Sequence, residues 1–185
     1  MLSKESIVLK AKNFAQNKHK NQKRKDGVTP FFDHLESVVN RMKNLGITNE
    51  EVLSAAWLHD VIEHTDTTFD ELNKIFGNTI SVLVLSLTKN YNLSKKDIET
   101  QYVSQLKNSS IQSKLIKFCD ISSNLKSIQN SSLSKTQKNK QIKKLFFYLR
   151  VIKKEIIEIE STYPKIREMI DGVNTIGAKF KQKPI

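Results

Sequence analysis

The stretch that decides the fold is VLSAAWLHDVIE, residues 52–63. An apolar run with helical character fills residues 52–58, and His59 and Asp60 follow it directly, with Glu63 close behind. If the helix continues through them, these three side chains project from neighbouring positions on one face. Imidazole and carboxylate groups are metal ligands, and a metal beside a free carboxylate can activate water. The stretch therefore predicts a helical core with a divalent metal held at its mouth.

Size and composition favour one helical domain. The chain has 185 residues with only 5 Gly and 3 Pro, so it offers few helix breakers. We expect a single domain over residues 1–178 and a flexible tail at 179–185. No apolar run approaches the roughly 18 residues of a membrane span, the first residues lack the apolar core of a secretory signal, and the single Cys119 excludes an internal disulfide. These features predict a soluble, cytoplasmic protein without a membrane partner.

The net charge of +12 allows two interpretations. Lys and Arg total 31, but the Lys residues are spread along the whole chain and Arg is scarce. Nucleic-acid readers often use Arg forks with interleaved aromatic residues, so this pattern argues against nucleic acid as a partner. The plain interpretation is a set of solvated Lys-rich faces. The sharper one is an electropositive mouth for a phosphorylated ligand, for which only the cluster at residues 18–25 is dense enough.

Apolar periodicity and capping residues predict a succession of helices. A strand remains an alternative for the β-branched stretch 80–87, although it would have no partner strand. We expect helices over residues 4–18, 30–46, 49–58, 69–76, 80–87, 95–106, 111–128, 135–160 and 164–172, with capping boxes at Thr48, Thr68 and Ser134. The fold class is therefore all-α, with about eight to ten helices.

Four potential ligands stand out: His34, His59, Asp60 and Asp120. They belong to three predicted helices, and each has apolar neighbours suited to an inward-facing position. Two imidazoles and two carboxylates suit Mn, Fe or Zn rather than Ca or Mg. Taken singly, each residue also has an ordinary structural explanation, such as a surface histidine or a buried salt bridge. Glu63, outside the ligand set, could orient a water molecule or carry its proton.

The order and context of these residues resemble the HD-domain metal-dependent phosphohydrolases, and in particular the RelA/SpoT-type hydrolase domain. The resemblance covers residues 5–150 and the chain is short, as in the stand-alone small alarmone hydrolases. It is carried by HKNQKRKDGVTP at 19–30, AAWLHDVIE at 55–63, Phe76-Gly77, Thr88-Lys89, and LIKFCD at 115–120 with Asn124.

The resemblance implies an HD-domain helical bundle, a Mn²⁺ ion (with Fe or Zn as alternatives), and hydrolysis of the 3′-pyrophosphate of (p)ppGpp, a guanosine alarmone. It makes His34, His59, Asp60 and Asp120 the metal ligands and Glu63 a catalytic carboxylate. It also places Arg24, Lys25, Lys95 and Asn124 where the family contacts the nucleotide. Arg24 can stack on a base or fork to phosphate. The plain alternatives are a solvated loop for Arg24 and Lys25, and exposure in a first helical turn for Lys95.

The chain departs from the family pattern at two places near the site. His64 stands where the family has a second acid after the catalytic Glu. An imidazole cannot supply a carboxylate's charge, but it can shuttle protons near neutral pH, contact phosphate, or leave catalysis weaker. Ile121-Ser122-Ser123 replaces a stretch where the family tends to carry a basic residue. The family's late-helix aromatic contact could be matched by Phe146 or by Tyr148, and the sequence leaves that register open.

Three functions follow from this sequence. The first is a metal-dependent (p)ppGpp 3′-pyrophosphohydrolase, with His64 as a further catalytic group beside Glu63. The second is an HD phosphohydrolase of another nucleotide, for example one that removes the 2′-phosphate of NADPH. The third is a weakly catalytic or non-catalytic nucleotide-binding module, or a nucleic-acid-binding helical module. The +12 charge favours this third function slightly, and four convergent ligands and a Glu argue against it. The sequence does not indicate an oligomeric state.

Overall fold

The computed structural model describes residues 6–24 and 26–185, and within them the chain forms ten helices and no strand. The all-α prediction is confirmed, and the strand alternative for residues 80–87 is wrong because α6 covers most of that stretch. The helices are α1 (Ile7–Lys18), α2 (Phe31–Asn44), α3 (Glu50–Leu58), α4 (Val61–His64), α5 (Phe69–Phe76), α6 (Asn78–Leu85), α7 (Lys95–Asn108), α8 (Ile111–Asn130), α9 (Lys135–Glu158) and α10 (Lys165–Lys179).

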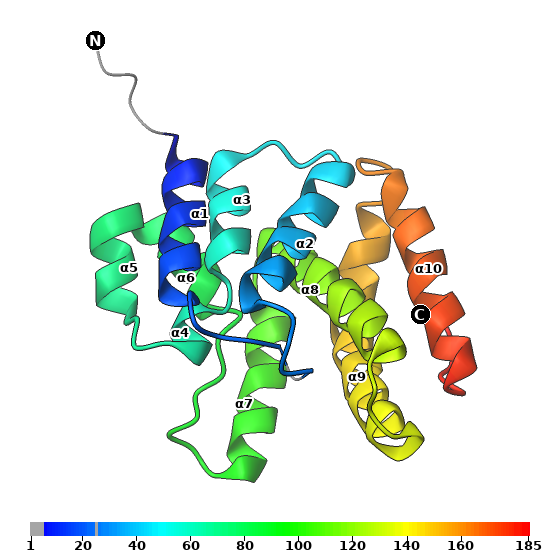
Figure 1. Ribbon diagram of the computed structural model, residues 1–185. Coiled ribbons are helices and arrows are strands. Elements are labelled where there is room, and N and C mark those ends of the chain that lie inside the picture. Colours follow the sequence, from blue (N-terminus) through cyan, green and yellow to red (C-terminus); the bar gives the residue numbers. More distant parts are fainter. Residues whose placement is uncertain (1–5, 25) are drawn as a thin grey trace.

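Helices α3 and α8 form the centre of the molecule (Figure 1). Helix α3 is buried from Val52 to Leu58 and packs against α1, α2, α6 and α8. Helix α8 packs against α2, α3, α9 and α10, so it joins the two halves of the bundle. Each fully buried Leu, Ile or Phe in this core stabilises the fold by about 1.5–3 kcal/mol relative to an exposed one. This packing makes the junction of α2, α3 and α8 a rigid place for a site.

Side-chain caps set most helix starts as the sequence predicts. Thr68 accepts a hydrogen bond from the Glu71 N–H at the start of α5, and Ser134 forms a full capping box with Gln137 at α9. One cap differs by a residue: Asn49, not Thr48, caps α3, because its side-chain oxygen accepts from the Val52 N–H at 3.0 Å.

One helix end differs from the sequence-based expectation, and the condition that the helix before His59 continues through Glu63 is not met. Helix α3 does not continue through the ligand pair, because Asp60 has φ −106° and ψ −3° and separates α3 from α4. This bridge region of φ/ψ space is one where many active-site residues sit. Helix α10 does not end near Gly172 but runs to Lys179. Its buried residues Ile170, Val173 and Gly177 continue the apolar stripe past Gly172, so burial outweighs the glycine's weak helix propensity.

The segment after α10 contacts the body of the protein. The Ile185 N–H donates to the Asn174 side chain at 2.9 Å, and Arg150 donates to the Lys183 carbonyl at 3.3 Å. The extent of the domain, and flexibility of residues 179–185, stay predictions from the sequence. Among the described residues, no helix is both long enough and apolar enough to cross a membrane.

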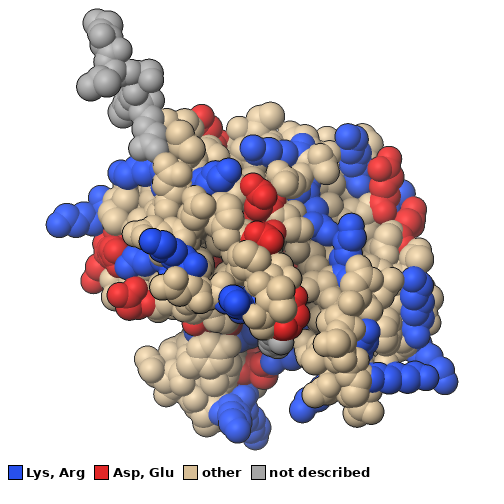
Figure 2. All heavy atoms as spheres, in the orientation of Figure 1, with Lys and Arg blue, Asp and Glu red and all other residues tan. Residues whose placement is uncertain are grey.

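Lys and Arg side chains are scattered over the face shown in Figure 2, with Asp and Glu between them, rather than gathered into one patch. The same face is hollowed between α7 and the end of the molecule where α8 meets α9 (Figures 1 and 2). On this face, the distribution matches the interpretation of solvated Lys-rich surfaces.

Candidate metal centre

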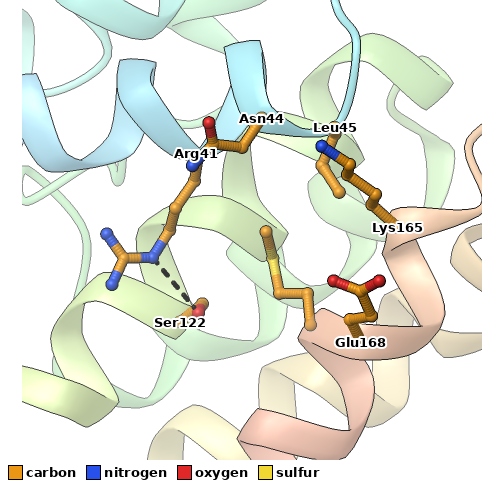
Figure 3. A pocket seen from close by; sticks show the side chains of 7 residues that line it. Arg41, Asn44, Leu45, Ser122, Lys165 and Glu168 are labelled. Carbon is orange, nitrogen blue, oxygen red and sulfur yellow. Dashed lines mark hydrogen bonds between the residues drawn. The ribbon is translucent and has the colours of Figure 1, made fainter.

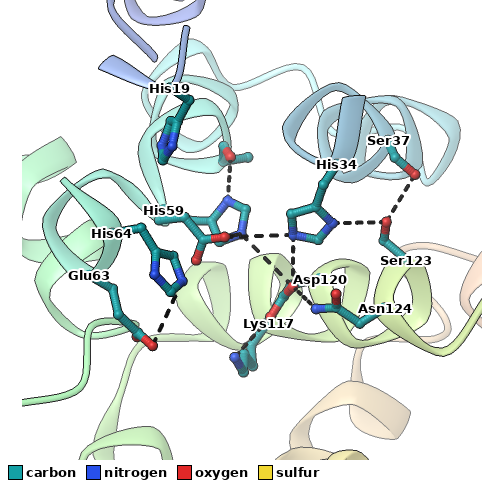
Figure 4. A network of polar contacts seen from close by, with 12 residues as sticks. His19, His34, Ser37, His59, Glu63, His64, Lys117, Asp120, Ser123 and Asn124 are labelled. Carbon is teal, nitrogen blue, oxygen red and sulfur yellow. Dashed lines mark hydrogen bonds and ion pairs between the residues drawn. The ribbon is translucent and has the colours of Figure 1, made fainter. Parts of the chain in front are cut away.

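The four potential ligands lie together where α2, the α3–α4 junction and α8 meet (Figure 4). The His34 Nε2 atom is 3.2 Å from Asp120 Oδ1 and 3.7 Å from Asp60 Oδ2. The His59 Nε2 atom is 3.4 Å from Asp60 Oδ2 and 3.9 Å from Asp120 Oδ1. One ligand atom each from His34, His59 and Asp120 lies within 4.8 Å of the others. Two imidazole nitrogens and two carboxylate oxygens thus face a common point.

The hydrogen bond of His59 fixes which of its nitrogens faces that point. Near the end of α3 the last carbonyl groups lack intrahelical partners, and the Ala56 carbonyl accepts a hydrogen bond from His59 Nδ1 at 2.8 Å. A carbonyl can only accept, so Nδ1 carries the proton in this tautomer. In this tautomer the Nε2 atom of His59 presents a lone pair to the carboxylates.

A chain of hydroxyl groups does the same for His34. Its Nδ1 atom is 3.2 Å from Ser123 Oγ on α8, and that hydroxyl donates to Ser37 Oγ at 3.0 Å. Because the Ser123 proton is used toward Ser37, the Ser123 oxygen accepts from His34 Nδ1–H. Ser37 accepts in turn from the Arg41 guanidinium. Arg41 also donates to Ser122 at 3.3 Å, and both residues line a shallow cavity of about 260 Å³ between α2, α8 and α10 (Figure 3). With the proton on Nδ1, the Nε2 atom of His34 also carries a lone pair, which faces the carboxylates.

The surroundings of the cluster favour a charged Asp120 and a neutral His34. Burial opposes the charged form of Asp120, but the Lys117 ammonium at 2.8 Å outweighs it and holds the pKa of Asp120 well below its usual value. Burial lowers the pKa of His34, which therefore stays neutral at pH 7.

These features fit a divalent cation. The Nε2 atoms of His34 and His59 are buried without any hydrogen-bond partner among the described residues. Buried polar atoms in folded proteins nearly always have partners, and here two lone pairs face ionised carboxylate oxygens. A cation at their common point removes this repulsion and satisfies both nitrogens. The mixed N/O donor set suits Mn, Fe or Zn.

Glu63 is held beside this centre by two donors. The Tyr91 hydroxyl donates to its Oε1 atom at 2.8 Å, and the Lys89 backbone N–H donates to Oε2 at 3.2 Å. The His64 ring is farther away, with Nε2 at 4.0 Å from Glu63 Oε1, and its side chain is 41% exposed. A separation of 4.0 Å is beyond hydrogen-bond distance. Glu63 therefore keeps its orientation without help from His64.

Arg24 and Asn124 form one line of contacts that ends on the candidate ligand Asp120. Arg24 donates to the Asn124 side chain at 2.6 Å, and Asn124 donates to Asp120 Oδ1 at 2.5 Å. The Arg24 guanidinium also lies 5.7 Å from the centre of the Phe31 ring. Lys25, expected beside Arg24, lies outside the described residues.

These groups line a cavity of about 640 Å³ between the loop after α1, α8 and α9. Asp60, Asp120 and Glu63 lie on its wall. Tyr148 also lines it, whereas Phe146 is fully buried in the core, so of the two aromatic candidates on α9 only Tyr148 can meet a ligand in this cavity. Lys95 is exposed in the first turn of α7, apart from the cavity wall.

Several contributing residues escaped sequence reasoning. Ser123, within the stretch that departs from the family pattern, orients His34. Tyr91 holds Glu63, and Lys117 holds Asp120. His19 and Gln22 also matter: Gln22 donates to the His64 carbonyl at 2.8 Å and pairs with the buried His19 ring. His19 and Gln22 lie in the family-like stretch at residues 19–30, so that stretch could have indicated them. No motif in the sequence indicates Tyr91.

Comparisons with known proteins agree with this geometry. A family model described as HD domain matches residues 11–151. The guanosine-3′,5′-bis(diphosphate) 3′-pyrophosphohydrolase MESH1 of Danio rerio is 40% identical over 128 residues, 68% of this chain and 71% of that protein. MESH1 of Homo sapiens is 38% identical over 130 residues, 69% and 73% of the two chains. A solved structure of a metazoan ortholog of SpoT that hydrolyses ppGpp superposes with a TM-score of 0.76 at 26% identity, covering 98% of this chain and 99% of the other.

Proposed function

The chain belongs to the HD-domain family, and from that premise we propose that it is a metal-dependent (p)ppGpp 3′-pyrophosphohydrolase. The relatives named for this activity match more than two thirds of the chain. The observation that carries the proposal is the pair of buried, unpartnered imidazole nitrogens facing two carboxylates on the wall of a cavity rich in cationic side chains. A guanosine nucleotide with several phosphates is the substrate class that suits such a cavity.

The proposed ligands are His34, His59, Asp60 and Asp120, and Mn²⁺ is the proposed ion. Support comes from the distances between their donor atoms, from the two fixed tautomers, and from the low pKa of Asp120. When bound, a divalent cation supplies Lewis acidity, which polarises a phosphoryl group and makes water a stronger acid. The residues around the cation determine which phosphoryl group and which water molecule lie next to it.

Glu63 is the proposed proton acceptor. Its two oxygens are each held by one donor, so its remaining lone pairs are aimed in a fixed direction from the cavity wall. A water molecule that attacks phosphorus must lose a proton, and a positioned carboxylate typically contributes 10²–10⁴-fold to such a step, an order-of-magnitude figure. Arg24 and Asn124 are proposed to contact the nucleotide, and the Arg24 guanidinium can stack on a base. Arg24 is linked to the proposed ligand Asp120 through Asn124, which accepts from Arg24 and donates to Asp120.

His64 favours a second candidate function. The imidazole takes the place of an acid beside Glu63, and with 41% of its side chain exposed it can reach a bound phosphate. Loss of a carboxylate at this position changes the charge that a substrate phosphate meets. An HD phosphohydrolase of another nucleotide, such as one that removes the 2′-phosphate of NADPH, is therefore the alternative.

A metal-supplemented screen of the purified protein tests both functions. The substrates are ppGpp, pppGpp, NADPH and simple nucleotides, and the readouts are pyrophosphate and phosphate release. We expect Mn²⁺-dependent release of pyrophosphate from ppGpp, which Asp60→Asn abolishes and which Asp171→Asn, at an exposed position on α10, leaves unchanged. Turnover of NADPH without turnover of ppGpp would establish the alternative instead.

His64→Asp separates the two roles of position 64. If the imidazole weakens alarmone hydrolysis, restoring the acid raises kcat with ppGpp. An unchanged or lower kcat would mean that His64 is compatible with the reaction as it stands.

A further inference from the structure

Three ammonium groups from three elements converge on the rings of two tyrosines. The Lys89 Nζ atom, just after α6, lies 4.8 Å from the Tyr102 ring centre and 5.3 Å from that of Tyr148. Lys117 on α8 lies 5.4 Å and 5.7 Å from the same two rings. Lys144 on α9 lies 5.8 Å from the Tyr148 ring. We call Lys89, Lys117 and Lys144 the lysine cluster; all three line the 640 Å³ cavity.

Among the described residues, the lysine cluster holds one cation without an ion-pair partner, Lys89. Lys117 pairs with Asp120 at 2.8 Å and Lys144 with Glu99 at 2.6 Å. Lys89 has no ion-pair partner among the described residues and lies against the tyrosine rings instead. Burial lowers the pKa of Lys89, and the positive charges of Lys117 and Lys144 lower it further. A partly buried cation beside two others is a place where an anion is stabilised.

The lysine cluster adjoins the candidate metal centre. The same Asp120 carboxylate presents Oδ1 to His34 Nε2 and Oδ2 to the Lys117 ammonium. On the other side, the Lys89 backbone N–H holds Glu63. An anion that reaches from the metal centre into the lysine cluster must therefore pass along Asp120, and it needs more than one phosphate to occupy both places.

We propose that the lysine cluster binds the terminal phosphate of a pyrophosphate group whose inner phosphate is attacked at the metal centre. This inference rests on the proposed function and assigns its specificity. In the reaction, water adds to the inner phosphorus, the bond from that phosphorus to the ribose 3′ oxygen breaks, and the 3′ oxygen takes a proton. The products from ppGpp are GDP and pyrophosphate, and the lysine cluster holds the terminal phosphate throughout.

The consequence is selection by the length of the phosphate chain. A substrate with a single phosphate at the reacting position, such as the 2′-phosphate of NADPH, leaves Lys89 and Lys144 without a phosphate to contact. Hydrogen bonds to charged groups are worth about 1.5–3 kcal/mol each, and about 1.4 kcal/mol is tenfold in affinity. Substrates that carry a pyrophosphate therefore gain a large advantage from residues that take no part in bond breaking.

The test compares Lys89→Gln and Lys144→Gln with Lys89→Arg, which keeps the charge, and with Lys96→Gln, a control at an exposed position on α7. Titration calorimetry with Mn²⁺-loaded protein, freed of excess metal, measures affinity for inorganic pyrophosphate and for inorganic phosphate. We expect the two Gln variants to bind pyrophosphate about tenfold more weakly or worse, on the strength of charged hydrogen bonds, with phosphate affinity unchanged within about twofold. The Lys89→Arg and Lys96→Gln proteins should behave as wild type.

Kinetics give the second measurement. Each Gln variant should lower kcat/KM for ppGpp through KM, and leave kcat/KM for guanosine 5′-diphosphate 3′-monophosphate unchanged. Equal pyrophosphate affinity in wild type and both Gln variants, or an equal loss of phosphate and pyrophosphate affinity, overturns the inference. Because the binding assay needs no turnover, wild type that discriminates pyrophosphate but does not hydrolyse ppGpp would refute the proposed function and keep the lysine cluster as a pyrophosphate site.

Discussion

Replacing Ser123 by alanine tests whether the hydroxyl chain behind His34 prepares the imidazole for a metal. Ser123 Oγ is 3.2 Å from His34 Nδ1 and donates onward to Ser37 at 3.0 Å. The variant removes this oxygen and leaves His34, Asp60 and Asp120 in place. We expect a weaker affinity for Mn²⁺ with little change in the stability of the metal-free protein.

The size of the effect follows from the two tautomers of His34. The His34 side chain is 2% exposed, so Nδ1–H has no water to replace the lost hydroxyl, and an unsatisfied buried donor costs about 1–3 kcal/mol. The metal-free variant avoids that cost by moving the proton to Nε2, where it can donate to Asp120 Oδ1 at 3.2 Å. Metal binding must reverse this change. A loss of about 10–100-fold in affinity is therefore expected, which is also typical when a hydrogen-bond partner of a metal-bound His is removed.

Competition with a metal chelator of known affinity measures the dissociation constant, and thermal unfolding without metal measures stability. Ser54→Ala is the matched control, because Ser54 is a buried serine on α3 whose hydroxyl has no hydrogen-bond partner among the described residues. Mn²⁺ affinity within twofold of wild type in Ser123→Ala, or an equal loss in Ser54→Ala, would refute the argument that this hydroxyl chain sets the tautomer.

Mn²⁺ at about 100 times its dissociation constant should stabilise the protein by about 2.7 kcal/mol and raise Tm by about 5–10 °C, measured by calorimetry with chelator-treated protein as reference. Gly177→Ala places a methyl group 2.2 Å from the buried Phe146 ring and should cost about 1–2 kcal/mol, whereas Gly172→Ala on the same helix has open space and should stabilise by up to about 1 kcal/mol; urea unfolding that ranks them the other way contradicts the packing. Burial lowers the pKa of His19, so the unfolded chain takes up a proton below about pH 6.5 that the folded protein refuses, and stability falls by up to about 1.4 kcal/mol per pH unit from there toward the lowered pKa. His19→Gln should reduce that slope in urea titrations between pH 7.5 and 5.5, and parallel slopes would exclude this contribution.

Local chemistry explains why the helices and the ligand cluster could be predicted from the sequence. The caps at Thr68 and Ser134 are satisfied within one helical turn, so a short window of sequence contains the whole interaction. Gly77 ends α5 with φ 83°, a conformation that favours glycine, whereas Gly172 stays helical because apolar positions beyond it are buried. Both are glycines after an apolar stripe, and only the tertiary packing distinguishes them.

The lysine cluster shows where such reasoning stops. Lys89 follows α6, Lys117 lies on α8 and Lys144 on α9. Lys89 and Lys117 fall within the family-like Thr88-Lys89 and LIKFCD stretches, but nothing in the sequence indicates that the three lysines meet. They meet only because α7 and α8 both pack against α9, which brings Tyr102 and Tyr148 together under three ammonium groups. The four candidate ligands were recognisable because His and Asp are scarce here and carry a specific chemistry, whereas Lys is common and acquires a role only through its neighbours in space. In a Lys-rich chain, phosphate specificity must therefore be sought in the charges that the fold leaves unpaired inside a cavity, and Lys89 is such a charge.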